Sequence, residues 1–265
     1  MKLSVSMTAF NSADIIRRTL APLQGLADEI IVVDSLSADR TPEIAREMGA
    51  TVYQEPWAGY VAQKQSAMDK TGGEWILCLD SDEVLDEEAV AAIRKILAGE
   101  SSVDAAVNGY SINRRTFYMN RLLKHAWQPD WKLRLVRRAA KPYVYGSDPH
   151  DAIGVEGKTA RLPGCLVHYS YKDFADHMQR SRSHAEVMAR SYHRRGKKAG
   201  RLDLLFRPPF VLFKRLLLQG AILDGVPGVM AAVSAAAYSY MKYAFLWEMN
   251  TRGGTGPDKG GKPEN

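Results

Sequence analysis

The sequence predicts an α/β fold with a mostly parallel central sheet, followed by a C-terminal helical region. Two observations lead to this prediction. In the first 80 residues, short apolar runs alternate with helical patterns of about ten residues, which is typical of βαβ units. Beyond residue 172 the strand pattern stops, and basic residues are interleaved with apolar residues in longer segments. The 265 residues, 46% of them apolar, suffice for one large domain and an appendage.

Each element of the N-terminal part has its own signal. Apolar runs predict strands at residues 3–10, 29–34, 51–54 and 75–79. Helical patterns lie between them, at residues 15–23, 41–48 and 59–68. Right-handed βαβ connections would make the strands parallel, and ligands of such sheets bind beyond the carboxyl ends of the strands. Asp34, Asp80 and Asp82 all fall at such ends.

Asp80 and Asp82 follow directly on the fourth predicted strand. Residues two apart share one face of a strand, so both side chains are expected to leave the sheet edge on the same side. Close carboxylates repel one another unless a cation lies between them. Mg²⁺ or Mn²⁺ fits, because hard cations take oxygen ligands and often leave positions for substrate phosphates. The alternative is a strand that ends in a solvated acidic turn and caps the next helix.

Glycine-rich phosphate loops are missing from the sequence. Neither G-x-G-x-x-G after the first strand nor G-x-x-x-x-G-K-[ST] occurs, so a dinucleotide site and a P-loop are both unsupported. A diphosphate would have to be held by a metal ion and basic side chains instead.

Three ordered motifs resemble a known family. Residues 4–11 (SVSMTAFN), 31–35 (IVVDS) and 79–83 (LDSDE) resemble the family 2 inverting glycosyltransferases, whose fold is GT-A. Further segments resemble the branch that adds a sugar to the inner core of lipopolysaccharide. They are residues 62–65, 113–116, 130–137, 150–151 and 166–171. The resemblance covers roughly residues 2–250.

The resemblance implies roles for several residues. On the nucleoside side it places Thr8, Phe10, Asn11 and Asp34. Lys64 stands where the family keeps a basic residue near the diphosphate, and Asp80 and Asp82 would bind the metal. His168 would make a further metal or diphosphate contact. Each role has a plain alternative: strand packing for Thr8 and Phe10, turn capping for Asp34, a solvated helix position for Lys64, and a hydrogen-bonded core position for His168.

The chemistry of inverting transfer requires a base. One displacement occurs at the anomeric carbon, and a carboxylate must take the proton from the acceptor hydroxyl. Asp151 is our candidate, although the resembling branch usually has glutamate there, and Asp148 is a rival. A turn carboxylate without a catalytic role is the alternative. Arg134 and Arg137 could face the phosphates or the acceptor, or could form a charged strand edge.

Two further departures from the family pattern concern loop shape. Leu36 stands where the family often has glycine in the turn after the second strand, so this loop is expected to differ. Ser81 replaces the more common alanine between the two acids. Neither change removes a ligand.

Charge is divided unevenly along the chain. Residues 1–100 carry 9 basic and 17 acidic side chains, whereas residues 101–265 carry 27 and 13. Residues 172–215 hold 12 of the basic side chains against 4 acidic ones. Such a stretch could bind nucleic acid or an anionic membrane surface. We expect no nucleic-acid partner, because no recognised nucleic-acid motif accompanies it.

The apolar segments that follow favour the membrane. Residues 206–218 are mostly apolar, and residues 225–241 carry no charge but are short for a spanning helix. They predict an amphipathic or partly embedded hairpin with four interfacial anchors: Tyr238, Tyr240, Tyr243 and Trp247. The alternative is a helical pair that covers the catalytic domain.

The remaining features concern compartment and boundaries. Cys78 and Cys165 are too few for a disulfide framework, and the N-terminal apolar stretch suits a first strand better than a signal peptide. We expect a cytoplasmic protein, peripheral on the inner face of the cytoplasmic membrane. The predicted division is a catalytic domain at 1–171, a helical region at 172–250 and a disordered tail at 251–265.

Together these features predict a metal-dependent enzyme that moves a hexose from a nucleotide-sugar donor to a lipid-linked or lipopolysaccharide-core acceptor. UDP-glucose is the donor that the resemblance favours. One alternative is a nucleotidyltransferase, although the basic, glycine-rich phosphate loop that it would normally need is absent. The other is a non-catalytic membrane scaffold in polysaccharide assembly, against which Asp80, Asp82 and Asp151 argue.

Overall fold

The computed structural model describes residues 1–100, 106–147 and 150–252. The chain divides into two compact units, and it passes between them more than once. Unit 1 comprises Met1–Phe117 and Pro129–Ser170. Unit 2 comprises Tyr118–Gln128 and the chain from Tyr171 onward. The sequence did not indicate that residues 118–128 group with the C-terminal helices.

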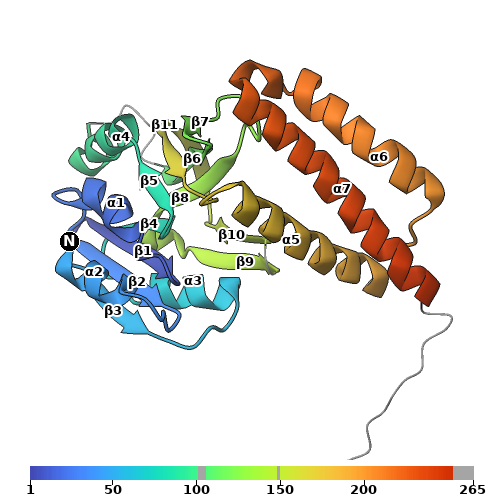
Figure 1. Cartoon of the computed structure of the whole chain (residues 1–265). Coiled ribbons are helices and arrows are strands. Elements are labelled where there is room, and N and C mark those ends of the chain that lie inside the picture. The colour runs from blue at the N-terminus through green and yellow to red at the C-terminus, as the bar shows by residue number, and fades with distance from the viewer. Residues whose placement is uncertain (101–105, 148–149, 253–265) are drawn as a thin grey trace, which may run out of the picture. The chain divides into compact units, whose positions relative to one another are not determined.

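Unit 1 is built on a mixed sheet of the order β3-β2-β1-β4-β8-β6-β11-β5 (Figure 1). The bounds are β1 Leu3–Ala9, β2 Glu29–Asp34, β3 Thr51–Gln54, β4 Trp75–Asp80, β5 Glu83–Leu85, β6 Val107–Tyr118, β8 Trp131–Arg137 and β11 Lys158–His168. The four N-terminal strands pair in parallel, as do β6 and β11. The predicted α/β fold is confirmed, with the difference that β8 lies antiparallel between β4 and β6.

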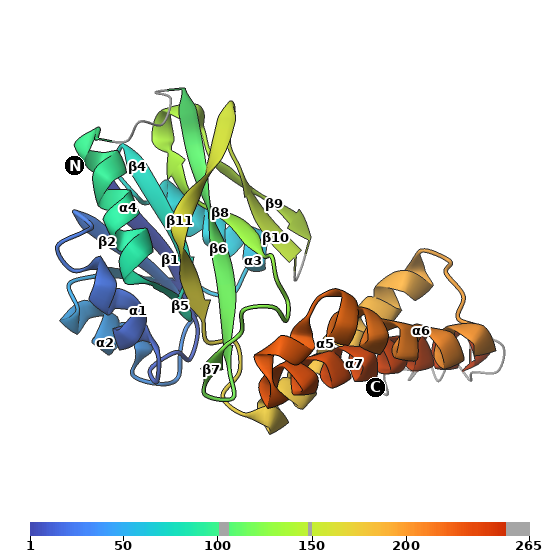
Figure 2. The same ribbon diagram turned by 90° about the horizontal axis from the view of Figure 1, so that it is seen from above.

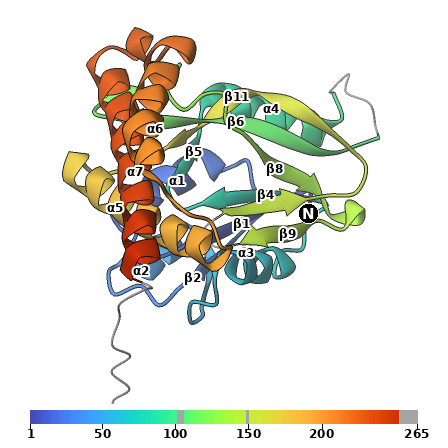
Figure 3. The ribbon, with the colours of Figure 1, turned by 90° about the vertical axis from the view of Figure 1, so that its right-hand side faces the viewer.

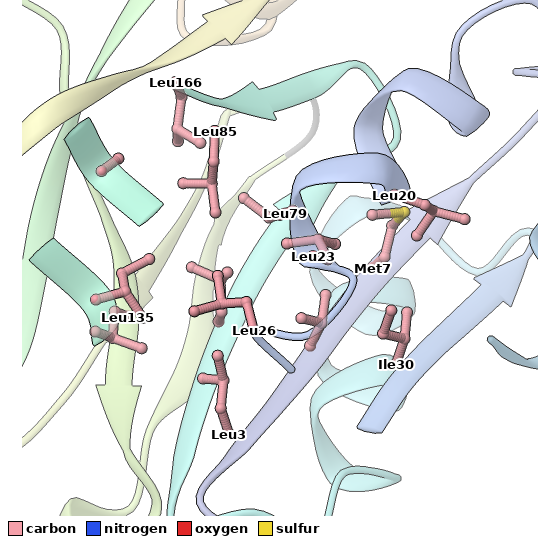
Figure 4. Close-up of a cluster of buried hydrophobic side chains, with 14 of the residues drawn as sticks. Leu3, Met7, Leu20, Leu23, Leu26, Ile30, Leu79, Leu85, Leu135 and Leu166 are labelled. Carbon is pink, nitrogen blue, oxygen red and sulfur yellow. The ribbon is translucent and has the colours of Figure 1, made fainter. Parts of the chain in front are cut away.

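One face of the sheet carries the larger core. The odd-numbered residues of β1 and β4 point into it, among them Leu3, Met7 and Leu79, which belong to the same core cluster as Leu20 and Leu23 (Figure 4). The helical elements on this face are α1 Ile16–Leu20, η1 Ala21–Leu23, α2 Thr41–Glu47 and α4 Glu87–Ala98. α4 packs along β11 (Figure 2). The predicted strands and helices of the first 80 residues are therefore present, with ends shifted by a residue or two.

The opposite face carries a smaller core and the even-numbered residues. Ile76 and Cys78 of β4 pack against Met68 of α3 Tyr60–Asp69, and against Val144 and Ile153. The last two belong to a separate antiparallel hairpin, formed by β9 Tyr143–Ser147 and β10 His150–Gly154. The helix α3 contacts β9 beside the carboxyl ends of β1 and β4 (Figure 3). The hairpin thereby brings Asp151 to the end of the sheet where ligands of parallel strands bind.

Unit 2 is helical. Its elements are β7 Arg121–Leu122, α5 Phe174–Arg194, α6 Arg201–Phe213, the π-helical turn η3 Lys214–Leu218, η4 Ala221–Asp224 and α7 Val226–Arg252. α7 packs against both α5 and α6 (Figures 1 and 3). It continues through Arg252, so the first two residues of the predicted tail are helical, and residues 253–265 lie outside the described part. None of the described helices combines the length and apolarity needed to cross a membrane.

Asp224 ties residues 118–128 to the helices of unit 2. Its buried carboxylate accepts hydrogen bonds from the backbone N–H groups of Lys124, His125 and Ala126, at 2.9, 2.9 and 2.7 Å. Burial opposes ionisation, but these three donors outweigh it and lower the pKa of Asp224. A single aspartate thus holds a strand connection that is distant in sequence.

Candidate functional site

A small pocket lies at the carboxyl ends of β1 and β4, on the α3 side of the sheet. Its lining residues are Ser6, Thr8, Lys64, Met68, Cys78, Leu79, Asp80, Arg134, Val144 and Ile153. Thr8 and Asp80 are register partners on adjacent parallel strands, so both face the same side. Burial raises the pKa of the Cys78 thiol to about 12, which makes it a packing group rather than a nucleophile.

Lys64 is the central residue of the pocket. Its Nζ lies 2.8 Å from Asp80 Oδ1 and 2.8 Å from Asp151 Oδ2. Burial favours the neutral amine, but the charges of Asp80 and Asp151 outweigh it and raise the pKa of Lys64. Lys64 is therefore not a solvated lysine on the surface of a helix, which was the alternative. Its ammonium group links helix α3 to strand β4 and to the β9–β10 hairpin.

A second cation holds the other side of Asp80. Arg134 Nη2 lies 3.1 Å from Asp80 Oδ2 and 2.6 Å from Glu83 Oε1. Burial opposes ionisation of Asp80, yet Lys64 and Arg134 outweigh it and hold its pKa well below the usual range. Glu83 is fully buried and also pairs with Arg114 at 3.3 Å. Charges of alternating sign therefore run through the base of the pocket.

Asp82 and Asp80 have different ion-pair partners, contrary to the expectation from strand alternation. β4 ends at Asp80, and the chain turns at Ser81 and Asp82 before β5 begins at Glu83. The turn breaks the two-residue period, so Asp82 Oδ2 lies 3.3 Å from His168 Nε2 while Asp80 faces Lys64. Across the described residues, no three acidic, histidine or cysteine side chains group as a metal site. The predicted trio of Asp80, Asp82 and His168 is therefore not assembled.

Asp82 and His168 nevertheless have the chemistry of two metal ligands. Ser170 Oγ lies 2.7 Å from His168 Nδ1 and orients the ring, an arrangement common for metal-binding histidines. The opposite nitrogen, Nε2, faces the Asp82 carboxylate, and a proton or a metal ion between them would relieve the repulsion of two acceptors. A hard cation held by these two residues would keep its other positions for phosphate oxygens. Asp80, held by two cations, is a poorer ligand.

The residues expected on the nucleoside side divide into two groups. Thr8 is half-buried at the end of β1, and Phe10 is exposed just beyond it. Asp34 is fully buried and accepts hydrogen bonds from the Ser37 backbone N–H, at 2.9 Å, and from the Ser37 hydroxyl. Asn11 Oδ1 accepts from the Ala38 N–H at 2.9 Å. Asp34 and Asn11 therefore both hold the turn after β2, as the capping alternative expects of Asp34, and their contact with a nucleoside stays a prediction.

The four remaining predicted residues differ in outcome. Asp151 lies on β10 beside Lys64, as described above, whereas Asp148 lies outside the described residues. Arg134 reaches the pocket. Arg137 does not, because its register partner is Trp75 at the start of β4, and its guanidinium lies over that ring at 4.7 Å.

Both departures from the family pattern have a structural counterpart. Leu36 has φ +59°, the left-handed region that favours glycine, so the exposed leucine there is strained. The Ser81 hydroxyl lies 2.7 Å from the hydroxyl of Ser12, and Thr19 donates to the Ser81 carbonyl at 2.6 Å. The serine thus fixes the turn that separates Asp80 from Asp82.

Sequence reasoning missed Glu83 and Arg114. Both lie in motifs of the family resemblance, 79–83 and 113–116, but apolar patterns do not indicate which of three neighbouring acids is buried or which arginine pairs with it. Their pairing depends on β5 and β6 meeting through β11, a contact that only the folded sheet provides.

Comparison with known proteins places these features in context. The model of the family described as glycosyl transferase family 2 matches residues 4–154. An uncharacterized glycosyltransferase of Rickettsia bellii is 27% identical over 258 residues, covering 94% of this chain and 87% of the relative. The lipopolysaccharide core biosynthesis glycosyltransferase LpsC of Rhizobium meliloti is 25% identical over 259 residues, covering 94% and 93%.

Solved structures show weaker likeness. Staphylococcus aureus TarS has a TM-score of 0.49 at 15% identity, covering 94% of this chain and 55% of TarS. Glucosyl-3-phosphoglycerate synthase from Mycobacterium tuberculosis, in complex with phosphoglyceric acid, has a TM-score of 0.47 at 18% identity, covering 74% and 80%. Both TM-scores are below 0.5, so the assignment of the chain to a family rests on the family model and not on these structures.

Proposed function

Because this chain belongs to glycosyl transferase family 2, we propose that it transfers a hexose, with glucose favoured, from a UDP-sugar to a lipid-linked or lipopolysaccharide-core saccharide. That it is a glycosyltransferase follows from the family model and from the relatives. The similarity to LpsC, a lipopolysaccharide core biosynthesis glycosyltransferase, supports the class of acceptor. The single observation that supports catalysis by this chain is the Lys64 bridge between Asp80 and Asp151.

Donor binding would use the cations of the pocket. Lys64 and Arg134 are held by Asp80, and a diphosphate is an anion that both cations would also bind. Thr8 and Phe10 lie at the end of β1, where the nucleoside would sit, and Asp34 and Asn11 would shape the adjoining loop. Without a glycine-rich phosphate loop, these side chains are the donor-binding groups that the chain offers.

A divalent cation, Mg²⁺ or Mn²⁺, would be held by Asp82 and His168, with phosphate oxygens of the donor completing its ligands. It would offset negative charge on the departing diphosphate. Asp80 then has a different task from the one predicted, because it holds Lys64 and Arg134 in position for the diphosphate.

Asp151 would act as the general base. In one displacement, the acceptor hydroxyl oxygen forms a bond to the anomeric carbon while the bond from that carbon to the diphosphate oxygen breaks. The hydroxyl proton goes to Asp151. Lys64 holds Oδ2 of Asp151, so Oδ1 is the oxygen that would accept the proton. The ion pair with Lys64 fixes the direction of the Asp151 side chain.

The reaction would take place on the inner face of the cytoplasmic membrane, without a nucleic-acid partner. Both cysteines, Cys78 and Cys165, are free and buried, which suits a reducing compartment. A lipid-linked acceptor would bring the enzyme to the bilayer surface.

The test is a donor-hydrolysis and transfer assay with the purified full chain, Mn²⁺ and a panel of nucleotide sugars. We expect release of UDP from one UDP-hexose above all others, and its loss in Asp151→Asn. Asp69→Asn, an exposed aspartate on the same helix as Lys64, is the control and should keep full activity. Turnover of no nucleotide sugar by a correctly folded protein, with and without lipopolysaccharide core acceptor, would overturn the proposal.

A further inference from the structure

The helix α6 exposes its apolar side. Leu202, Leu205, Phe206, Phe210 and Phe213 are 50 to 71% exposed. At 3.6 residues per turn they form one stripe about 140° wide. On the opposite side of α6, Leu204, Pro208 and Val211 are partly buried, and the helix packs against α7. An amphipathic helix normally buries such a stripe, whereas these five side chains stay at least half exposed among the described residues of unit 2.

Exposed apolar residues continue along the chain beyond α6. Five large apolar residues of the next elements are also about half exposed or more: Leu217, Leu218, Ile222, Leu223 and Val226. We call the ten residues together the α6 ridge. Ten large exposed apolar side chains along consecutive elements exceed the scattered exposure expected of a soluble surface, and such patches mark interaction sites.

The interfacial anchors that the sequence indicated on α7 are different. Tyr243 packs against Tyr192 with ring centroids 6.5 Å apart, and Arg207 lies over its ring at 4.7 Å. Lys242 lies 5.6 Å from the centre of the Tyr238 ring. Two of the four predicted anchors are thus engaged inside unit 2. Tyr240 and Trp247 are exposed but lie outside the ridge.

A band of positive charge adjoins the ridge. Residues 194–215 contain eight Lys and Arg but one acid, Asp203, which pairs with Arg207. Arg194, Arg195, Lys197 and Lys198 are all exposed in the stretch that leads into α6. Exposed cations next to exposed apolar side chains match a surface with negative headgroups above hydrocarbon. They disfavour pairing of two copies, whose basic bands would repel one another.

We propose that the α6 ridge inserts into the headgroup boundary of an anionic lipid bilayer, with the basic band on the headgroups. This inference deepens the proposed function, since a lipid-linked acceptor lies at a bilayer. Vesicle binding needs neither donor nor acceptor, so its failure and the failure of glycosyl transfer are separate results.

The experiment is co-sedimentation of the full chain with phosphatidylcholine vesicles, with and without phosphatidylglycerol. The apolar variant is Leu205→Ser/Phe206→Ser/Phe210→Ser, and its control is Val187→Ser/Tyr240→Ser, two exposed apolar residues outside the ridge. The charge variant is Lys197→Gln/Lys198→Gln, and its control is Arg94→Gln/Lys95→Gln, an exposed pair on α4. Circular dichroism and light scattering report the fold and mass of each.

We expect the wild type to bind vesicles that contain phosphatidylglycerol, less tightly as salt rises. The charge variant should bind about 30-fold more weakly, from about fivefold for each cation, and the apolar variant at least about 100-fold more weakly. Both controls should bind like the wild type. The proposal is overturned if the wild type ignores both vesicles, if the control pair Val187→Ser/Tyr240→Ser loses binding instead, or if the apolar variant only converts a dimer to a monomer.

Discussion

Lys64 and Asp151 are 87 residues apart in the sequence, yet the lysine Nζ donates to the aspartate Oδ2 at 2.8 Å. The same Nζ lies 2.8 Å from Asp80 Oδ1. One ammonium group therefore fixes the position of the candidate base relative to the carboxyl end of β4. A change at Lys64 should disturb both the fold of the hairpin and the site.

Replacing Lys64 with methionine should destabilise unit 1. The change leaves Asp80 and Asp151 without their shared cation, and both carboxylates are largely buried. We expect a loss of about 2 kcal/mol in the free energy of unfolding. This lies between the cost of breaking an exposed ion pair and the cost of removing one partner of a fully buried pair. Urea unfolding measures it, and Lys64→Arg should restore most of the loss. Equal stability of Lys64→Met and wild type would mean that the bridge is not formed in solution.

Replacing Asp82 with asparagine should weaken metal-dependent donor binding and abolish transfer, while the protein stays folded. Asp82 is partly exposed and its side chain pairs with His168, so the neutral amide fits the site but loses a charged ligand. Calorimetric titration with UDP, with and without Mn²⁺, measures the effect. Asp69→Asn is the control. Full transfer activity in excess chelator would contradict the role of a metal.

Replacing Asp151 with asparagine should lower turnover by ~10² to 10⁴ with little change in donor affinity, as for loss of a general base. The amide can still accept from Lys64 but cannot take a proton. Steady-state kinetics and UDP titration distinguish this from the Asp82 variant, in which binding itself weakens. Asp148→Asn is the informative comparison, because an inactive Asp148 variant beside an active Asp151 variant would reassign the base.

Stability of unit 2 should fall as the pH drops below about 6.5. His177 is buried, with Nδ1 2.8 Å from the Tyr118 hydroxyl, and burial lowers its pKa. The folded pKa lies below the unfolded value, so the unfolded chain binds the proton first, and the stabilisation present at higher pH is lost as pH falls. Melting temperatures between about pH 8 and pH 5 test this. His177→Phe should flatten the dependence, and His193→Gln, an exposed histidine on the same helix, should not.

Replacing Leu36 with glycine should stabilise unit 1 slightly. A left-handed conformation costs a non-glycine residue about 1–2 kcal/mol, and glycine would remove that cost. Glycine also raises the conformational entropy of the unfolded chain, which offsets part of the stabilisation. We expect up to about 1 kcal/mol of added unfolding free energy. Leu36→Ala keeps the Cβ atom and is the control, with no gain expected. A loss of stability in the glycine variant would show that the leucine side chain packs in solution.

The predictable part of the fold is the part with local pattern. The four parallel strands have apolar runs of their own, and the helices between them have helical periodicity, so each could be read from its own residues. The position of β8 could not, because its neighbours β4 and β6 are chosen by long-range pairing. The same holds for residues 118–128, whose partner Asp224 is 98 to 100 residues away.

The candidate site also divides into a part that local sequence patterns predicted and a part that depends on the folded chain. Asp80, Asp151, Lys64 and Arg134 were all predicted near the donor, and the structure brings them together. The separation of Asp82 from Asp80 was missed because strand alternation was extended through a turn. Ser81 and Leu36 were noted as departures, but a single sequence does not show that one forms a hydrogen bond and the other adopts a positive φ.

The hydrogen bonds of Asp224 also set an order of events on the ribosome. Lys124, His125 and Ala126 leave the exit tunnel about 100 residues before the carboxylate that binds them. At ~5–20 residues per second, this segment waits roughly 5 to 20 s for its partner. During that interval the side chains of Tyr118 and Leu123, buried in the finished protein, are open to water. A chaperone that shields apolar chain near residue 120 would therefore act on this protein before α7 is made.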